Sequence, residues 1–368
     1  MRKFCLLLAM LFLVGFLQAQ PDSTGNDAPP IDEDFSSYGD IGTGVKRYCT
    51  QKVQNLTPTK LYGGGYEVQG PFSIKSKKGE PYRNDPNYNN VTDSPEDVNV
   101  KAVHGLHLNV NYPIISKSSL IVSLTAQYQE SRFIIDDPKG YSLYRSLNDR
   151  GLRTGGIGTT IFKPLNETRF MIIQAQADVN GDFGLNELGT AFSSGLTISG
   201  AFIYGWKKND RFMWGLGAVR TYRGGETLHI PVLFYNRTFN DRWGIEVLFP
   251  ARVHFRRNFS PKSLLQLGYE IVGNSYHISN VSDVVGSDLR PYDDLQLRRS
   301  EIKIRAVYEQ SLKNFIWISV QAGLRYNYKF NLSEARDVKE GLFNKKFLLN
   351  NDIGHTPYVS VGVYLVSP

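Results

Sequence analysis

His277 and Ser279 are the two residues whose types and spacing come nearest to a catalytic arrangement in this sequence. Residues two apart in a β-strand project from the same face, so the imidazole could activate the hydroxyl as a nucleophile. The alternative interpretation is a polar shoulder where a strand passes into a loop. We expect the second interpretation and therefore predict no catalytic residues and no enzyme.

Charged residues alternate with apolar ones along several segments, which places the charges together on one face of each segment. If these segments are strands that cross a bilayer, an arginine facing lipid would cost about 2–4 kcal/mol, so the charges must face the lumen. There they either pair into a network that fills the barrel or line a pore that favours anions. The sequence leaves both interpretations open. The predicted lumen residues are Glu246, Arg252, His254, Arg256, Glu270, Arg299, Glu301, Lys303, Arg305 and Arg325.

The sequence lacks the motifs of several other common binding and catalytic sites. The sequence contains no phosphate-binding loop, no zinc-ligand spacing and no Gly-x-Ser-x-Gly elbow. The formal net charge is +7, and Arg2 and Lys3, which contribute to it, lie in a segment that we expect to be removed. The remaining positive excess is small and dispersed, which does not indicate a nucleic-acid surface. We therefore predict no cofactor, no metal and no nucleic-acid partner.

The elements that position the charged faces are long strands. From Lys60 onward, apolar and polar residues alternate in stretches of roughly nine to fifteen residues. Strands in soluble proteins average about five or six residues, whereas a strand tilted across a bilayer needs about nine to eleven. The candidate strands lie near 60–70, 101–112, 119–132, 153–162, 168–180, 196–206, 211–222, 229–237, 242–249, 251–257, 263–277, 295–309, 315–328 and 355–366.

The connections between these strands are alternately short and long, which is typical of an outer-membrane barrel with short periplasmic turns and long outer loops. The sequence thus predicts an all-β fold, a transmembrane antiparallel up-and-down β-barrel of about 14 strands. Pro250 interrupts the pattern, because proline cannot donate to a central ladder. It marks either a tight outer turn or a bulge inside one long strand, and the bulge leads to a fallback of 12 strands.

The first residues read as an export signal. Arg2 and Lys3 precede a short apolar run that ends in a small-residue exit at Ala19, which predicts a signal peptide over residues 1–19. Residues 20–59 are polar and rich in acidic residues and proline, which predicts a solvated periplasmic N-terminal extension. The barrel domain is expected over residues 60–368.

The signal that ends in Leu-Gln-Ala-Gln, the long loops rich in Asn and Asp, and the strands that begin at Trp243 and Leu264 resemble the uncharacterised outer-membrane β-barrel families of Gram-negative bacteria. The resemblance covers about residues 60 to 368 and lies in the pattern, not in a catalytic motif. It implies a location in the cell outer membrane. It also implies outer-membrane lipid and the barrel assembly machinery as partners.

The fragment His277-x-Ser279-Asn280 is similar to part of the motif of the outer-membrane phospholipase A. The glycine expected after the asparagine is Val281 here, and the upstream motif of that family is missing.

The expected function is a channel or transporter for small solutes. The alternative is a non-conducting structural or surface-interaction barrel, and the remote alternative is a membrane-embedded lipid hydrolase.

Overall fold

The computed structural model describes residues 47–78, 97–138, 142–184, 186–187, 189, 191–192, 195–222, 227–279, 295–334 and 347–367. In chain order the elements are β1 (Lys60–Gln69), β2 (Phe72–Lys78), β3 (Val98–Lys117), β4 (Leu120–Ile135), α2 (Ser142–Asp149), β5 (Leu152–Pro164), β6 (Arg169–Gly181), β7 (Leu196–Asn209), β8 (Phe212–Thr221), β9 (Leu228–Thr238), β10 (Trp243–Phe249), β11 (Arg252–Ser260), β12 (Ser263–Ile278), β13 (Leu295–Lys313), β14 (Ile316–Glu334), β15 (Leu349–Ile353) and β16 (Thr356–Val366). No helix among the described residues is long and apolar enough to cross a membrane.

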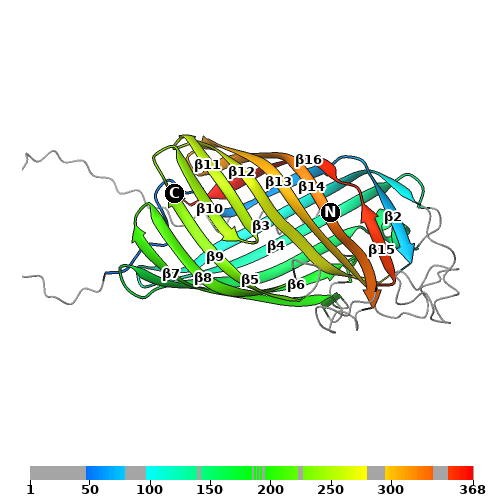
Figure 1. Ribbon diagram of the computed structural model, residues 1–368, viewed down its shortest axis with the longest axis horizontal. Coiled ribbons are helices and arrows are strands. Elements are labelled where there is room, and N and C mark those ends of the chain that lie inside the picture. Colours follow the sequence, from blue (N-terminus) through cyan, green and yellow to red (C-terminus); the bar gives the residue numbers. More distant parts are fainter. Residues whose placement is uncertain are drawn as a thin grey trace, which may run out of the picture. The chain divides into compact units, whose positions relative to one another are not determined.

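Fourteen of these strands form a closed antiparallel barrel (Figure 1). Strands β3 to β14 pair in chain order, β14 pairs with β16, and β1 closes the ring between β16 and β3. The predicted fold class and strand count are confirmed. Each predicted strand coincides with one strand of the ring.

Strands β2 and β15 continue β1 and β16 beyond short interruptions. Gln69 pairs with Val103 and Phe72 pairs with Val100, so the register against β3 is the same on both sides of residues 70–71. Proline in that interruption cannot donate to the ladder, which explains the break. The two short strands pair with each other and lengthen the ring at one end.

One end of the barrel, the short-turn end, is closed by tight connections such as the one between Lys117 and Leu120. The other end, the loop end, carries the long connections. The connection at Pro250 is a turn at the loop end, because β10 ends at Phe249 and β11 begins at Arg252. Of the two interpretations of Pro250, the tight turn is therefore right, and the fallback of 12 strands is wrong.

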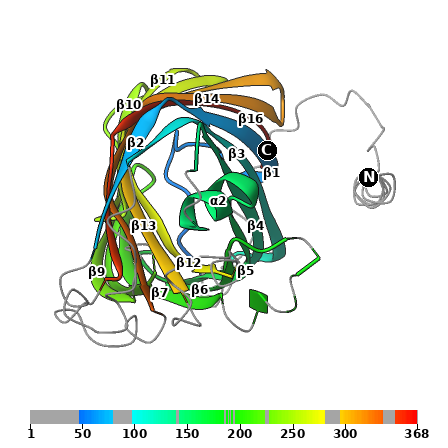
Figure 2. The ribbon, with the colours of Figure 1, turned by 90° about the vertical axis from the view of Figure 1, so that its right-hand side faces the viewer.

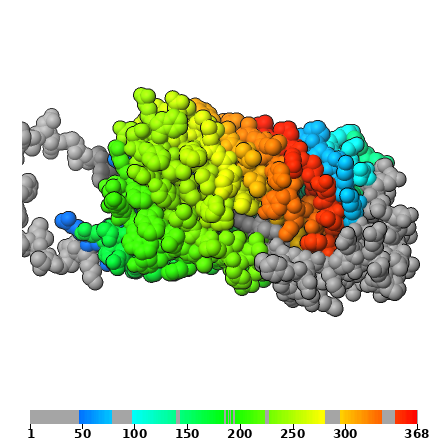
Figure 3. Space-filling model, in the orientation of Figure 1, coloured from blue at the N-terminus to red at the C-terminus, as the bar shows by residue number. Residues whose placement is uncertain are grey.

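The alternation along each strand sorts apolar residues to the outside and polar ones to the lumen. On β13, Ile304 is 55% exposed, whereas its neighbour Lys303 is 8% exposed. On β16, Val361 is exposed and Ser360 is buried. Figure 3 shows one side of the outer surface. Exposed apolar residues such as Ile304 and Val361 give this surface the apolar character that contact with lipid requires.

An apolar cluster fills the lumen at the loop end. Helix α2 lies inside the ring of strands (Figure 2). Its residues Leu143, Tyr144 and Leu147 are fully buried among inward residues of β2 to β5 and β12 to β15. The Tyr144 hydroxyl lies 2.6 Å from the Ser76 hydroxyl. Burying one such apolar side chain stabilises a fold by about 1.5–3 kcal/mol. The segment expected to be a polar outer loop, residues 133–152, therefore includes a helix that packs inside the barrel.

Strands β6 and β12 meet at the loop end, although five strands separate them around the ring. Gly181 of β6 pairs in parallel with His277 of β12, and the Asp182 amide donates to the His277 carbonyl at 3.1 Å. A Cβ on Gly181 would lie 2.8 Å from that carbonyl oxygen, so only glycine permits the approach. Strands β7 to β11 end closer to the short-turn end, so this β6–β12 bridge lies on their loop-end side.

Residues 47–59 occupy the lumen at the short-turn end. Cys49 and Val53 are buried with inward residues of β5, β6 and β8. The Gln54 amide donates to the carbonyl of Asp210 at 2.7 Å, in the β7–β8 turn. Within the stretch expected to be a solvated extension, Cys49 and Val53 are thus buried against the barrel, whereas residues 50–52 and 54–55 are exposed. The signal peptide and the rest of the extension lie outside the described residues.

Candidate functional site

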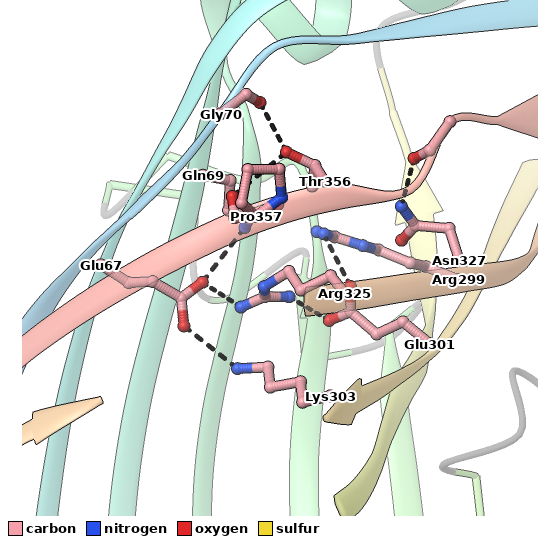
Figure 4. Close-up of polar contacts among 11 residues, drawn as sticks. Glu67, Gln69, Gly70, Arg299, Glu301, Lys303, Arg325, Asn327, Thr356 and Pro357 are labelled. Carbon is pink, nitrogen blue, oxygen red and sulfur yellow. Dashed lines mark hydrogen bonds and ion pairs between the residues drawn. The ribbon is translucent and has the colours of Figure 1, made fainter. Parts of the chain in front are cut away.

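Arg325 of β14 lies at the centre of a buried ion-pair network in the lumen (Figure 4). Its guanidinium pairs with Glu67 of β1 and Glu301 of β13. Glu67 also pairs with Lys303 at 3.2 Å, and Glu301 with Arg299 at 3.3 Å. The side chains of Glu301 and Arg325 are only 3% and 2% exposed. Buried charges are tolerated only when they are paired and hydrogen-bonded, so this part of the lumen is a packed network.

Arg305 forms a second group at the middle of the barrel. Its guanidinium pairs with Glu270 of β12 at 2.9 Å and donates to the Gln321 side chain at 3.2 Å. The same guanidinium lies 3.4 Å from Nε2 of His254. The Glu270 carboxylate thus offsets the charge of Arg305.

Arg256 and Glu246 form a third group near the short-turn end. The Arg256 side chain is fully buried, pairs with Glu246 at 2.6 Å and donates to the Thr238 hydroxyl at 2.9 Å. Glu246 also accepts hydrogen bonds from the Thr57 amide at 3.1 Å and hydroxyl at 2.7 Å. Gln266 donates to the same hydroxyl at 2.6 Å. This carboxylate therefore joins the barrel wall to residues 47–59.

Arg252 differs from the other predicted lumen residues. It lies at the start of β11, two residues before His254 on the same strand face, and is exposed. No residue in the described part of the chain forms a hydrogen bond or ion pair with it. Its guanidinium is therefore the charge of this set that is available to a ligand.

A cavity of about 650 Å³ lies in the lumen. Its wall is rich in amides, including Gln127 and Gln176, which both donate to Asp178 at 2.8 Å. Arg252 and Lys303 contribute cationic side chains to the same wall. The basic residues of the wall are Lys60, Arg220, Arg252, Lys303 and Arg305, and the acidic ones are Glu67, Glu130, Asp178 and Glu270. The charge of the cavity wall is consequently nearly balanced, and apolar residues such as Val232 and Ile271 share the wall with the polar ones.

The predicted His277 and Ser279 pair lies at the β6–β12 bridge. Both the amide and the hydroxyl of Ser279 donate to the Asp182 carboxylate, at 2.9 and 2.8 Å. Asn280 lies outside the described residues. Ser279 therefore ties the end of β12 to the residue that follows β6, which supports the interpretation as a polar strand end.

Sequence reasoning missed three residues that shape the lumen. Glu67 completes the Arg325 network, and its alternation with Tyr66 and Val68 was the signal that it faces inward. Asp178 alternates with Ala177 and Val179, which was the same kind of signal. No pattern in the sequence indicated that Thr57 faces inward, because a polar residue in a polar segment is expected to be solvated. No group of three or more metal-ligating side chains occurs among the described residues.

Residues 137–365 match the model of a protein family described as a domain of unknown function, DUF6268. The chain belongs to this family. Together with the fold, this agrees with the predicted resemblance to uncharacterised outer-membrane barrels. A search of curated proteins found no match.

Solved structures with a similar fold are outer-membrane barrels. A FadL homologue of Pseudomonas aeruginosa is 12% identical, with 83% of this chain and 90% of that chain covered and a TM-score of 0.35. The toluene transporter TodX of Pseudomonas putida is 9% identical, with 87% and 95% covered and a TM-score of 0.28. The outer-membrane protease OmpT of Escherichia coli is 7% identical, with 85% and 99% covered and a TM-score of 0.24.

Proposed function

We propose that this protein is a gated outer-membrane barrel that admits small solutes to its central cavity. The observation that carries the proposal is the cavity of about 650 Å³, with both polar and apolar residues in its wall, inside a lumen that is otherwise packed. Ligand pockets commonly have volumes of about 300–1,000 Å³. A barrel that served only as a scaffold would gain stability by filling this space.

Residues 47–59 are the proposed gate at the short-turn end. They are held mainly by hydrogen bonds, among them those from Thr57 to Glu246 and from Lys207 Nζ to the Lys52 carbonyl at 3.0 Å. A net hydrogen bond stabilises by about 0.5–1.5 kcal/mol, so a few of them can be exchanged for bonds to water at modest cost. Opening this end requires displacement of that segment and not of the barrel wall.

The nearly balanced charge of the cavity wall bears on selectivity. Of the two interpretations of the charged faces, the pore that favours anions needs a positive excess, and Glu67 and Asp178 reduce that excess. We therefore propose only a weak preference for anions, which depends on Arg252.

Solute flux into liposomes tests the proposal. Mature protein reconstituted in liposomes is diluted into isotonic arabinose, and swelling is followed by light scattering. We expect slow swelling for the native chain and at least threefold faster swelling for Thr57→Val, because valine loses the hydroxyl bonds to Glu246 and Gln266. Arg257→Gln is the matched control, since Arg257 stacks outside the lumen on Trp243 at 5.2 Å. Rates equal to those of protein-free liposomes for every variant would contradict a solute channel.

The second candidate function is a non-conducting barrel that displays its outer loops. The buried network around Arg325 favours it, because packed and paired charges hold a barrel closed. Absence of swelling in folded, inserted protein is the outcome expected of this alternative.

A further inference from the structure

The unequal lengths of the strands interrupt the barrel wall below the β6–β12 bridge. Strand β12 pairs with β11 as far as Glu270 and then continues to Ile278, paired with β13. On the opposite side, β7 pairs with β8 only from Gly200 onward, although the strand begins at Leu196. Between these two edges, β10 and β11 have already turned at Pro250. Figure 1 shows β10 and β11 ending well before β12 and β13.

Several backbone edges therefore face one opening. In the described part of the chain, residues 196–199 of β7 and 228–232 of β9 have a partner strand on one side only. Residues 272–276 of β12 likewise pair only with β13. The bridge between Gly181 and His277 closes the opening on the loop side. Because both edges of the opening belong to the barrel itself, the opening is lateral and not axial.

The central cavity extends to this opening. Its lining includes Ser199, Thr221, Ile230, Ala251 and Val272, which come from the five strands and turns around the rim. None of the cavity lining belongs to the apolar cluster around α2. Packed side chains thus fill the space between the cavity and the loop end. Among the described residues, the lateral opening is the path by which a molecule could leave the cavity on this side.

The two sides of the rim differ in polarity. Outside, Leu196, Ile198 and Phe249 are 45%, 55% and 52% exposed. Inside, the exposed guanidinium of Arg252 lies at the turn that forms the lower rim, without a protein partner among the described residues. An apolar exterior next to the guanidinium of Arg252 complements a molecule with an apolar chain and an anionic head.

We propose that this opening is a lateral portal, at which the headgroup of an anionic amphiphile reaches Arg252 in the cavity while its apolar chain stays against the outer wall. The proposal rests on the proposed function, because it names the class of molecule that the same cavity takes. A soluble anion would use Arg252 but gain nothing from Leu196, Ile198 and Phe249. An uncharged amphiphile would use the apolar rim but not the guanidinium.

Cysteine protection in lipid vesicles tests the portal. Cys49 is replaced by serine, and Ser199→Cys places a thiol on the cavity side of the rim. A methanethiosulfonate reagent is added with dodecanoate, dodecanol or acetate at the same concentration. We expect dodecanoate to slow the labelling at least fivefold, and dodecanol and acetate to slow it less than twofold. A cysteine at Leu216, which is 53% exposed on the outer face, should not be protected differently by the three compounds.

Arg252→Gln added to Ser199→Cys should remove the protection, and Arg257→Gln on the outward face of the same strand should keep it. The gel shift on heating verifies that each variant is folded. Equal protection by acetate would overturn the amphiphile, equal protection by dodecanol would overturn the role of the charge, and no protection would overturn the portal. If no compound protects the thiol but the liposomes still swell in arabinose, the portal is refuted and the solute channel is not. If dodecanoate protects the thiol but the liposomes do not swell, the solute channel is refuted and the portal is not.

Discussion

The buried network around Arg325 predicts opposite consequences for two substitutions on neighbouring inward positions of one strand. Arg299, Lys303 and Arg325 carry three positive charges, and Glu67 and Glu301 carry two negative ones. Glu301→Gln raises the unbalanced charge of this buried cluster from one to two. Lys303→Gln removes the imbalance altogether.

Removing one partner of a buried ion pair costs about 3–5 kcal/mol, because the remaining charge is left without compensation. Glu301 pairs with both Arg299 and Arg325, so we expect Glu301→Gln to lower the free energy of unfolding by that amount. Lys303→Gln loses a 3.2 Å contact, yet Glu67 keeps Arg325 and a hydrogen bond from Gln69. Its expected cost is about 1 kcal/mol or less.

Urea titration of the barrel in liposomes, followed by tryptophan fluorescence and by the gel shift on heating, measures both changes. The double variant Glu301→Gln, Lys303→Gln has the same unbalanced charge as the native network, so it should be more stable than the sum of the single losses predicts, by about 0.5–3 kcal/mol. If Lys303→Gln destabilises as much as Glu301→Gln, or if the two losses add, charge balance does not control the stability of this network.

The remaining predictions concern location, register and the segment at the short-turn end. The protein should fractionate with outer membranes and migrate differently on gels when unheated, and recovery in the soluble periplasmic fraction would contradict the barrel in a membrane. Ile304→Arg should hinder folding into liposomes by about 2–4 kcal/mol, with Lys303→Gln as the tolerated comparison, because Ile304 faces outward. Burial raises the pKa of the Cys49 thiol, so maleimide should label the folded protein slowly at neutral pH and the urea-unfolded protein at the rate of a free thiol. Thr57→Val should speed that labelling in the folded protein, and an unchanged rate would show that the Thr57 contacts do not hold the segment.

The strand faces and the strand number could be predicted because they depend on local alternation. A strand buries or exposes every second residue, so the placement of Lys303 and Ile304 follows from the sequence alone once lipid is assumed outside. The strand ends were less accurate. Strand β14 extends beyond its predicted limit at residue 328 because its last residues, such as Phe330 and Leu332, pack on the apolar cluster instead of facing lipid.

The partners of the charged residues could not be read in the same way. Glu67 and Arg325 are separated by 258 positions in the sequence, and only closure of the ring brings β1, β14 and β16 together. The burial of Cys49 and Val53 could not be predicted for a different reason. Their burial depends on hydrogen bonds from polar side chains and the backbone to the turns of the barrel, and composition alone does not distinguish such a segment from a solvated one.

One half of the barrel wall is held together by buried ion pairs, and in the other half strand pairing is incomplete. The stability of the second half depends on the first. Around β1, β13, β14 and β16, buried ion pairs fix neighbouring strands to one another across the lumen. Around β8 to β11, the strands are short and leave polar edges beside the cavity, together with the guanidinium of Arg252, which has no partner among the described residues. An interrupted wall exposes unpaired backbone groups, which costs stability in or near lipid. The bridge between β6 and β12 limits that exposure, and the network in the opposite wall supplies stability that the short strands cannot. Weakening the network should therefore destabilise the whole barrel, whereas substitutions on the rim should alter binding with little effect on folding.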